Sequence, residues 1–352
     1  MSDLSFVRTE MLPPKEPPAT EVGVIGWLRE NLFSGWKNTV LTILSLLAIY
    51  LVLSEILPWI FHSAWNAGSL DECRKLIKSA YGEEASGACW AVIRERWLQL
   101  LFGFYPTELY WRPILTFVLL IVAIAPVLFP ELPRRLLSFT PIFPFVAVWL
   151  LWGGSIWTPI MALLGFVIGY VAFTLVTPRM GAILGVIAAV LVPVIWWLYL
   201  AGPVAEAIHG LVPIGLEPVK SRLFGGFMLS ITIGVTAIGA SLPLGIILAL
   251  ARQSDLFIVK TLSVGFIEFI RGVPLITLLF VASTLLNIFM PPGTNFDIIL
   301  RVMIMTTIFA AAYMAEVIRG GLAALPKGQY EAAAALGLDY WKSMRLVILP
   351  QA

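Results

Sequence analysis

Residues 136–178 read LLSFTPIFPFVAVWLLWGGSIWTPIMALLGFVIGYVAFTLVTP and contain no charged side chain. A helix that crosses a bilayer needs about 20 mostly apolar residues, so this stretch is long enough for two crossings. Gly153, Gly154 and Ser155 lie near its middle and suit a tight turn between two helices. The stretch therefore predicts a pair of membrane-spanning α-helices.

The composition of the whole chain supports the same class. The 352 residues are 59% hydrophobic and only 12% charged, with a mean hydropathy of +0.92. Soluble proteins carry about 25% charged residues, and disordered chains are poor in apolar residues. A net charge of +2 gives no reason to expect nucleic-acid binding, and two cysteines with two histidines are too few for a zinc cluster. We expect an all-α integral membrane protein, a multi-span helical bundle, with no metal site.

Further gaps between charged residues are also long and apolar enough to cross the membrane. They are residues 38–61, 113–130, 180–205, 223–251, 261–284 and 298–318, the first interrupted by Glu55. Pro243 and Pro274 lie inside two of these spans, where a proline is expected to kink or break the helix.

The spans divide the chain into three predicted parts. Residues 1–37 form a polar, flexible tail, and residues 38–222 form an N-terminal membrane extension of about five spans with an extracytoplasmic loop at 62–112. Residues 223–352 form the third part. Lysine and arginine concentrate on the cytoplasmic side of membrane proteins. With the N-terminus in the cytoplasm, thirteen basic residues lie inside and eight outside, which favours this orientation.

The predicted outside loop contains both cysteines, Cys73 and Cys89. In an oxidising compartment they can form a disulfide, and the alternative is a pair of buried free thiols. In the same loop Trp90, Ile93 and Trp97 recur at helical spacing. This spacing predicts an amphipathic helix that lies on the membrane surface or packs on its neighbours.

The last span is followed by GLAALPKGQYEAAAALGLDYWKSMRLVILPQA, residues 321–352. Gly328 is expected to break the preceding structure, and the alanine-rich run from Glu331 to Leu336 favours a helix. We expect Glu331 in the first turn, where a carboxylate complements the helix dipole, and we expect Gly337 to end or bend the helix. The pattern predicts a short surface helix whose small side chains let another protein approach closely.

The spacing within this segment is specific. The segment contains Glu331, Ala332 and Ala333, and three residues separate them from Gly337. Nine further residues separate Gly337 from Val347, which is followed by Leu349 and Pro350. This resembles the EAA loop of ATP-binding-cassette (ABC) importer permeases, which reads E-A-A, three residues, G, nine residues, I, one residue, L-P. Val347 in place of Ile is the one departure. In that family the loop contains the coupling helix, which sits in a cleft of the ATPase subunit; the alternative is an ordinary alanine-rich helix between two spans. The resemblance assigns coupling to Gly328, Gln329, Glu331, Ala332, Ala333, Gly337, Leu349 and Pro350.

Two upstream stretches narrow the resemblance to the polar amino-acid (histidine/glutamine-type) permeases. Residues 268–275, EFIRGVPL, look like their E-F-x-R-G-x-P-L, and residues 312–321, AYMAEVIRGG, look like their A-Y-x-A-E-x-x-R-G-G. The resemblance makes residues 223–352 a type I ABC importer permease core of three spans plus the EAA loop. With its long N-terminal extension, the chain looks most like the M-type permease subunit of general L-amino-acid importers. That family continues past P-Q-A with further membrane helices, so the resemblance implies a core that is incomplete at its C-terminus.

The resemblance implies a permease subunit of the bacterial inner membrane, and not an enzyme, that moves amino acids into the cytoplasm by alternating access. Separate ABC ATPase subunits are then expected to bind ATP and magnesium, with no cofactor on this chain, which lacks G-x-x-x-x-G-K-[ST]. The other implied partners are a second homologous permease or a copy of this chain, a periplasmic amino-acid-binding protein and the lipid bilayer. The alternative is an ion-coupled secondary transporter, although no matching pair of broken-helix repeats supports it.

Charged residues in or near the last two spans form two pairs, each three residues apart: Glu268 with Arg271, and Glu316 with Arg319. Charges at membrane depth are costly, so they pair with one another or face a cavity. This leaves two interpretations. The residues line the pathway of a zwitterionic amino acid, or they form ion pairs that lock the helices together.

Overall fold

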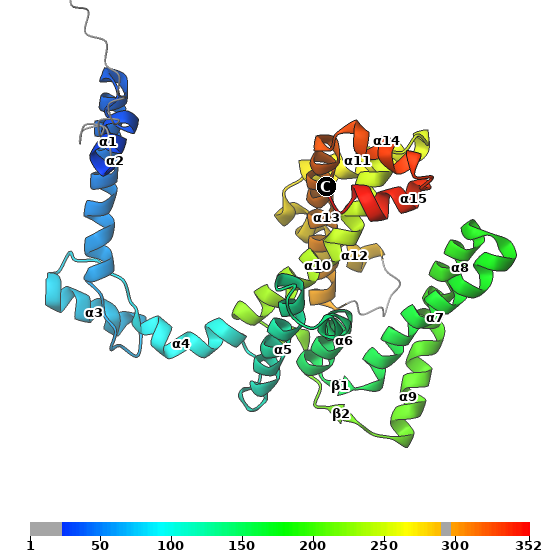
Figure 1. Cartoon of the computed structure of the whole chain (residues 1–352). Helices are drawn as coiled ribbons and strands as arrows, with labels where there is room; N and C mark the ends of the chain where they lie inside the picture. The colour runs from blue at the N-terminus through cyan, green and yellow to red at the C-terminus, as the bar shows by residue number, and fades with distance from the viewer. Residues whose placement is uncertain (1–22, 290–296) are drawn as a thin grey trace, which may run out of the picture. The chain divides into compact units, whose positions relative to one another are not determined.

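The computed structural model of the chain describes residues 23–289 and 297–352, and its regular structure is mostly helical (Figure 1). The elements of the N-terminal third are α1 (Gly23–Asn31), α2 (Trp36–Phe61), α3 (Leu70–Tyr81), α4 (Ala91–Phe102), η1 (Thr107–Leu109) and α5 (Trp111–Leu128). The middle comprises η2 (Arg134–Ser138), α6 (Phe139–Trp152), β1 (Gly154–Ser155), α7 (Trp157–Met180), α8 (Ala182–Ile195), the π-helical turn η3 (Trp196–Leu200), α9 (Ala201–Leu211), β2 (Gly215–Leu216) and η4 (Ser221–Leu223). The remainder comprises α10 (Gly226–Arg252), α11 (Phe257–Gly272), α12 (Leu275–Phe289), α13 (Ile298–Ala324), α14 (Lys327–Ala335), α15 (Tyr340–Ser343) and the π-helical turn η5 (Met344–Ile348).

The chain divides into two compact units, Met1–Trp97 and Leu98–Ala352. In the first unit, α2 is long and apolar enough to cross a membrane, and none of its residues is buried. The sequence predicted a flexible tail up to residue 37. Residues 1–22 lie outside the described residues, but residues 23–31 form the helix α1, so this part of the prediction is wrong. Residues 1–37 are polar on average, and this average conceals the apolar side chains of α1.

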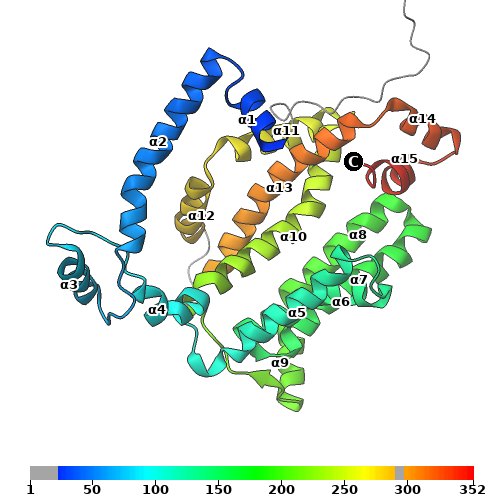
Figure 2. The same ribbon diagram turned by 60° about the vertical axis from the view of Figure 1, so that its left-hand side comes forward.

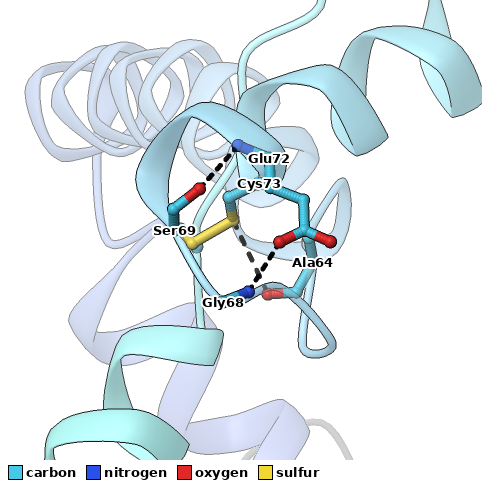
Figure 3. Close-up of a disulfide and its surroundings, with 6 residues drawn as sticks. Ala64, Gly68, Ser69, Glu72 and Cys73 are labelled. Carbon is cyan, nitrogen blue, oxygen red and sulfur yellow. Dashed lines mark hydrogen bonds between the residues drawn. A yellow bond between two sulfur atoms is a disulfide. The ribbon is translucent and has the colours of Figure 1, made fainter.

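The predicted outside loop is folded around α3, as Figure 3 shows. Ser69 caps the helix by accepting a hydrogen bond from the backbone N–H of Glu72 at 3.2 Å. The Glu72 carboxylate in turn accepts from the N–H of Gly68 at 2.8 Å, so two unpaired donors at the helix start are satisfied. Cys73, in the first turn, is joined to Cys89 by a disulfide. The predicted helix that follows Trp90 is α4.

The second unit contains most of the membrane-spanning helices. Counting α2 of the first unit, seven helices among the described residues are long and apolar enough to cross a membrane. Besides α2 they are Thr107–Leu128, Arg134–Trp152, Trp157–Met180, Ala182–Leu211, Gly226–Arg252 and Ile298–Ala324. The uncharged stretch that decided the fold class forms the two helices α6 and α7, and Gly153 and Gly154 make the turn between them with φ of +72° and +81°. The prediction of a multi-span helical bundle is confirmed.

One end of the second unit is closed by contacts that the sequence did not predict. Gly154 and Ser155 pair antiparallel with Leu216 and Gly215, which joins the α6–α7 turn to the segment after α9. Close by, the buried Arg112 donates from Nη1 to the carbonyl of Glu217 at 2.6 Å. We call this end the β-ladder end. It holds a hydrophobic core that includes Phe224, Met228 and Ile299.

The same end fixes the starts of α10 and α13. Trp152 Nε1 donates to Ser221 Oγ at 2.8 Å, and the Ser221 hydroxyl donates to Asp297. Asp297 also caps α13, accepting from the N–H groups of Ile299 and Leu300 at 2.9 and 3.1 Å. Residues 152, 221 and 297 therefore meet at one point, which places the first turns of α10 and α13 side by side.

The helices α10 and α13 run parallel and in contact over their whole length (Figure 2). Met228 packs with Ile299 near their starts, and Ala249 packs with Ala315 near their ends. Between these points Gly245 lies so close to α13 that a Cβ atom there would be 2.7 Å from the nearest side-chain atom. Since both helices point the same way, the chain between them has to return across the membrane.

This return is made by two helices, and not by the single span predicted at 261–284. The helices α11 and α12 are bent by 102° at residues 273–274. Val273 is extended, with φ −106° and ψ 132°, because the ring of Pro274 disfavours helical backbone in the residue before it. The carbonyl of Pro274 then accepts hydrogen bonds from Thr277 and Leu278, which starts α12. The expectation for Pro274 is thus confirmed, whereas Pro243 lies inside the continuous helix α10.

Candidate functional site

At the end of the second unit opposite the β-ladder end, side chains from three helices form a charged cluster. Arg252, the last residue of α10, donates from Nη1 to Glu316 Oε1 on α13 at 2.5 Å and to Glu268 Oε1 on α11 at 3.0 Å. Glu316 is the more enclosed carboxylate, since its side chain is 17% exposed and that of Glu268 is 54% exposed. One guanidinium thus connects both carboxylates that the sequence singled out.

Two further arginines complete the charged cluster. Arg271 Nη1 lies 3.6 Å from Glu316 Oε2 and 3.9 Å from Glu268 Oε2, and its guanidinium lies 5.5 Å from the ring centroid of Tyr313. Arg319 Nε donates to Glu316 Oε2 at 3.0 Å, within α13. The four charged residues predicted from the sequence are therefore together, and each makes at least one ion pair.

These contacts are the ones that the helix-locking interpretation predicts. Both interpretations of the four residues stay predictions. Burying charges is costly, and the cost falls when opposite charges pair with hydrogen-bonding geometry, as Arg252 and Glu316 do. The cluster joins the ends of α10 and α11 to the second half of α13, beside the packing of Ala249, Ile267 and Ala315. It therefore fixes where the broken span meets the two parallel helices.

Arg252 is the central residue that the sequence analysis did not select. It was counted only as one of the inside basic residues, because its partners are 16 and 64 positions away along the chain. The available signal was its position, as the first charge after the uncharged run 223–251. A charge at that point lies at the depth where the two predicted ion pairs were expected.

The predicted surface helix is present as α14, four residues longer at its start than the predicted run at 331–336. Leu325 and Pro326 have extended backbone and separate α13 from α14. Gly328 therefore does not break the preceding structure but lies inside α14, because the preceding proline already ends helical backbone. Glu331 consequently lies in the second turn and not the first.

Gly337 ends α14 through backbone hydrogen bonds. The N–H of Leu338 donates to the carbonyl of Ala333 at 3.2 Å, and the N–H of Gly337 donates to that of Ala334 at 2.9 Å. This is the Schellman arrangement, which requires left-handed backbone at the residue before Leu338. Gly337 has a φ of +71°, a value that a residue with a Cβ atom adopts only at a cost.

The segment after α14 is held to the ends of the two parallel helices. Met344 and Ile348 of η5 are buried against Leu322 of α13, and Leu250 of α10 packs on the same cluster. Tyr330, Val347 and Leu349 also border this cluster, which we call the anchor cluster: Leu322, Met344, Ile348 and their partly buried neighbours. The helix α14 is therefore connected to α10 and α13 through packed side chains.

The other predicted loop residues divide between the inside and the surface. Ala333 is buried, and Gln329 accepts a hydrogen bond from Gln351 at 3.2 Å. Glu331, Ala332, Gly328 and Pro350 are exposed. Two large apolar side chains are also exposed near the end of α14, since Leu336 and Trp341 are 77% and 71% exposed. Small side chains therefore predominate on the exposed side of α14, beside the charged Lys327 and Glu331.

A broken span lies between two parallel spans and is followed by a folded helical loop, and discontinuous spans are common in membrane transporters. The family of binding-protein-dependent transport system inner membrane components matches residues 241–352. The glutamate/glutamine/aspartate/asparagine transport system permease protein BztC of Rhodobacter capsulatus is 59% identical over 100% of this chain and 81% of its own length. The inner membrane amino-acid ABC transporter permease protein YhdY of Escherichia coli is 37% identical over 97% of this chain and 75% of its own length. The chain belongs to this family of amino-acid ABC transporter permeases.

A solved structure also matches part of the chain. The crystal structure of an amino acid ABC transporter with histidines covers 35% of this chain and 56% of its own, with 32% identity and a TM-score of 0.31. As a permease of this family, the chain is a multi-pass inner membrane protein and a non-catalytic subunit, and ATP hydrolysis belongs to a separate subunit. The two relatives that match nearly all of this chain are described as transport-system permeases. They give no support to the alternative of an ion-coupled secondary transporter.

Proposed function

We propose that this chain is the permease subunit of an importer for acidic amino acids and their amides. The observation that carries the substrate class is the relative that is 59% identical over the whole chain, which is described as a glutamate/glutamine/aspartate/asparagine permease. The importer further contains ABC ATPase subunits, a second homologous permease and a periplasmic amino-acid-binding protein.

The N-terminus lies in the cytoplasm in this proposal, and so does the segment 319–352. The second unit supports this orientation by itself. Basic residues of its loops and helix ends gather opposite the β-ladder end: Arg134, Arg135, Arg179, Arg252, Lys260, Arg319, Lys327, Lys342 and Arg345. At the β-ladder end they are Arg112, Lys220, Arg222 and Arg301. The richer side is the cytoplasmic side. When the broken pair α11–α12 is counted as one crossing, the described part of the chain has eight spans. An even number of spans places the N-terminus and the segment 319–352 on the same side of the membrane.

The helix α14 docks on the ATPase subunit in this proposal. Its exposed alanines allow close approach, while Leu336 and Trp341 offer apolar surface to a partner. When the ATPase subunits close on ATP, they displace α14, and the anchor cluster carries this displacement to the ends of α10 and α13. The charged cluster lies on the same helix ends, so its ion pairs rearrange as the permease alternates between its outward-facing and inward-facing states.

The docking proposal is tested by co-purification of the ATPase subunit with the full-length permease. Ala335→Trp adds a large side chain on the exposed side of α14, at a position where a helix tolerates it. The matched control is Ala80→Trp, an equal change at an exposed alanine of α3. We expect the Ala335 variant to lose most of the bound ATPase and the control to keep it. Retention by both variants would overturn docking through α14.

The substrate class is tested by uptake into cells that express the complete importer. Radiolabelled glutamate, glutamine, aspartate and asparagine are expected to accumulate, whereas lysine and leucine are not. Accumulation should depend on ATP and persist when a protonophore collapses the proton gradient. Uptake that stops with the proton gradient at normal ATP would overturn the ATP-driven proposal.

A further inference from the structure

The helix α1 has an apolar side that the described residues of its own unit, 23–97, leave exposed. Val24, Ile25 and Trp27 are 75%, 65% and 57% exposed. At about 100° per residue these three side chains and Leu28 fall within one arc of roughly 160°. Arg29 and Glu30 lie on the opposite side of the helix. A nine-residue helix of this kind is marginal in water, so its apolar side requires a partner.

The next segment of the chain indicates the partner. Only four residues separate α1 from α2, which has no buried residue and is long and apolar enough to span the bilayer. The hydroxyl of Thr42 donates to the carbonyl of Leu32 at 2.8 Å, so the connection is held against the second turn of α2. The helix α1 therefore stays within a short distance of the level at which α2 enters the membrane.

That level is marked by the first residues of α2. Trp36 is 75% exposed and lies beside Lys37, whose ammonium is 5.8 Å from the centroid of its ring. Tryptophan and lysine gather at the headgroup level, where an amphipathic ring and a long cationic side chain reach both apolar and polar surroundings. An exposed apolar arc at this level meets the boundary between headgroups and acyl chains.

We propose that α1 lies in the plane of the lipid headgroups, with Val24, Ile25, Trp27 and Leu28 facing the acyl chains. The charges of Arg29 and Glu30 then face water. Because one is positive and the other negative, they cancel, so the helix is held by burial of its apolar side chains and not by attraction to anionic lipids. The inferred partner is the lipid bilayer surface. The helix sets the depth of the first span and links it to the segment that precedes residue 23.

The proposal is tested with nitroxide labels on the full-length chain in phosphatidylcholine nanodiscs, with the natural disulfide intact. Leu28→Cys and Glu30→Cys place labels on opposite sides of α1. Ile43→Cys in α2 and Lys78→Cys in α3 give the reference values for acyl chains and for water. Collisions with oxygen report acyl chains, and collisions with a water-soluble nickel chelate report the aqueous phase. We expect the Leu28 label to favour oxygen several-fold relative to the Glu30 label, close to the Ile43 reference.

Two results would overturn the proposal. Equal nickel accessibility of the Leu28 and Glu30 labels would mean that α1 stands in water. Low accessibility of the Leu28 label to both reagents would mean that protein, and not lipid, covers the apolar side. Val24→Cys repeats the measurement at a second exposed position, which separates these outcomes from a local disturbance by the Leu28 label.

Discussion

Arg252 donates to Glu316 at 2.5 Å, and this contact joins the end of α10 to α13 across 64 positions of sequence. The two helices already pack in parallel along their length, so the contact adds an ion pair to an apolar helix–helix interface. Because the same guanidinium also bonds Glu268, the connection includes α11, which leads into the bend before α12. One side chain therefore connects three helices.

Replacing Arg252 by alanine is expected to destabilise the permease. The change leaves Glu268 and Glu316 without their shared partner, and a partly buried ion pair of this kind is worth about 1–3 kcal/mol. The matched control is Arg319→Ala, which removes an ion pair within one helix and should cost less than about 1 kcal/mol. Thermal unfolding in nanodiscs measures both. Equal losses would contradict a special role for Arg252, and partial recovery in a double variant with Glu316→Ala would confirm direct coupling.

Replacing Pro274 by alanine is expected to weaken the break between α11 and α12. The alanine regains an N–H group and releases Val273 from its extended conformation. Spin labels at the exposed residues Leu262 and Phe280 report the break, because an unbroken helix would hold the two positions roughly 27 Å apart along its axis. We expect a shorter distance in the parent chain and a broader, longer distribution in the variant.

Pro243→Ala serves as the control for this measurement. Pro243 lies within the continuous helix α10, so its replacement should leave the distance between labels unchanged. If the parent chain itself gave the distance of an unbroken helix, the description of two helices would be wrong.

Gly337 is expected to tolerate asparagine and not valine. Its φ of +71° costs an ordinary L-residue roughly 1–2 kcal/mol, and a β-branched residue pays most, while asparagine adopts this region more readily. A Cβ atom at this position meets no other atom within 4 Å, so the cost is one of backbone conformation and not of crowding. Hydrogen exchange at the N–H groups of Gly337 and Leu338 should speed up in the valine variant alone.

The disulfide between Cys73 and Cys89 is expected to form in cells. It closes a loop with a sequence separation of 16, for which chain entropy predicts a stabilisation of about 3 kcal/mol. Labelling with a maleimide polymer before and after reduction counts the free thiols. We expect none before reduction in a wild-type strain and two in a strain whose periplasm lacks its disulfide oxidant. Free thiols in both strains would contradict an extracytoplasmic position of this loop.

Acidification is expected to loosen the start of α15. Asp339 accepts a hydrogen bond from the backbone N–H of Lys342 at 2.8 Å, and this bond, together with the Lys342 ammonium, holds the pKa of Asp339 below its ordinary value of 3.8. The carboxylate therefore stabilises α15 fully above that ordinary value, and the stabilisation is lost as the pH falls through the lower folded value. Hydrogen exchange at Lys342 should rise on acidification relative to the intrinsic rate. In Asp339→Asn, which keeps a capping oxygen, this relative rise should be absent.

The sequence predicts the fold class and the spans well, because membrane crossing is recorded locally as a long run without charge. The runs around α6 and α7 illustrate this, as does the helix-ending role of Gly337, which follows from its backbone freedom. The break at Pro274 was also visible, since proline acts on the residue directly before it. These features depend on neighbours within a few positions.

Features that depend on distant partners were not predictable in the same way. Arg252 shows no local sign of its bonds to Glu268 and Glu316, and the ladder between β1 and β2 joins residues about sixty positions apart through only two residues from each strand. The start of α14 was misplaced for a different reason. Gly328 and Pro326 are both helix-breaking residues, and composition alone does not show which of them separates α13 from α14.

The ladder between β1 and β2 has a consequence for how this chain is assembled from parts. The pairing of Ser155 with Gly215 brings together the two ends of the segment that contains α7, α8 and α9, and these helices pack chiefly on one another. The segment thus leaves and re-enters the remaining structure at a single point. Such a segment has the layout of an inserted module: deleting residues 156–214 would require only that two adjacent backbones be rejoined.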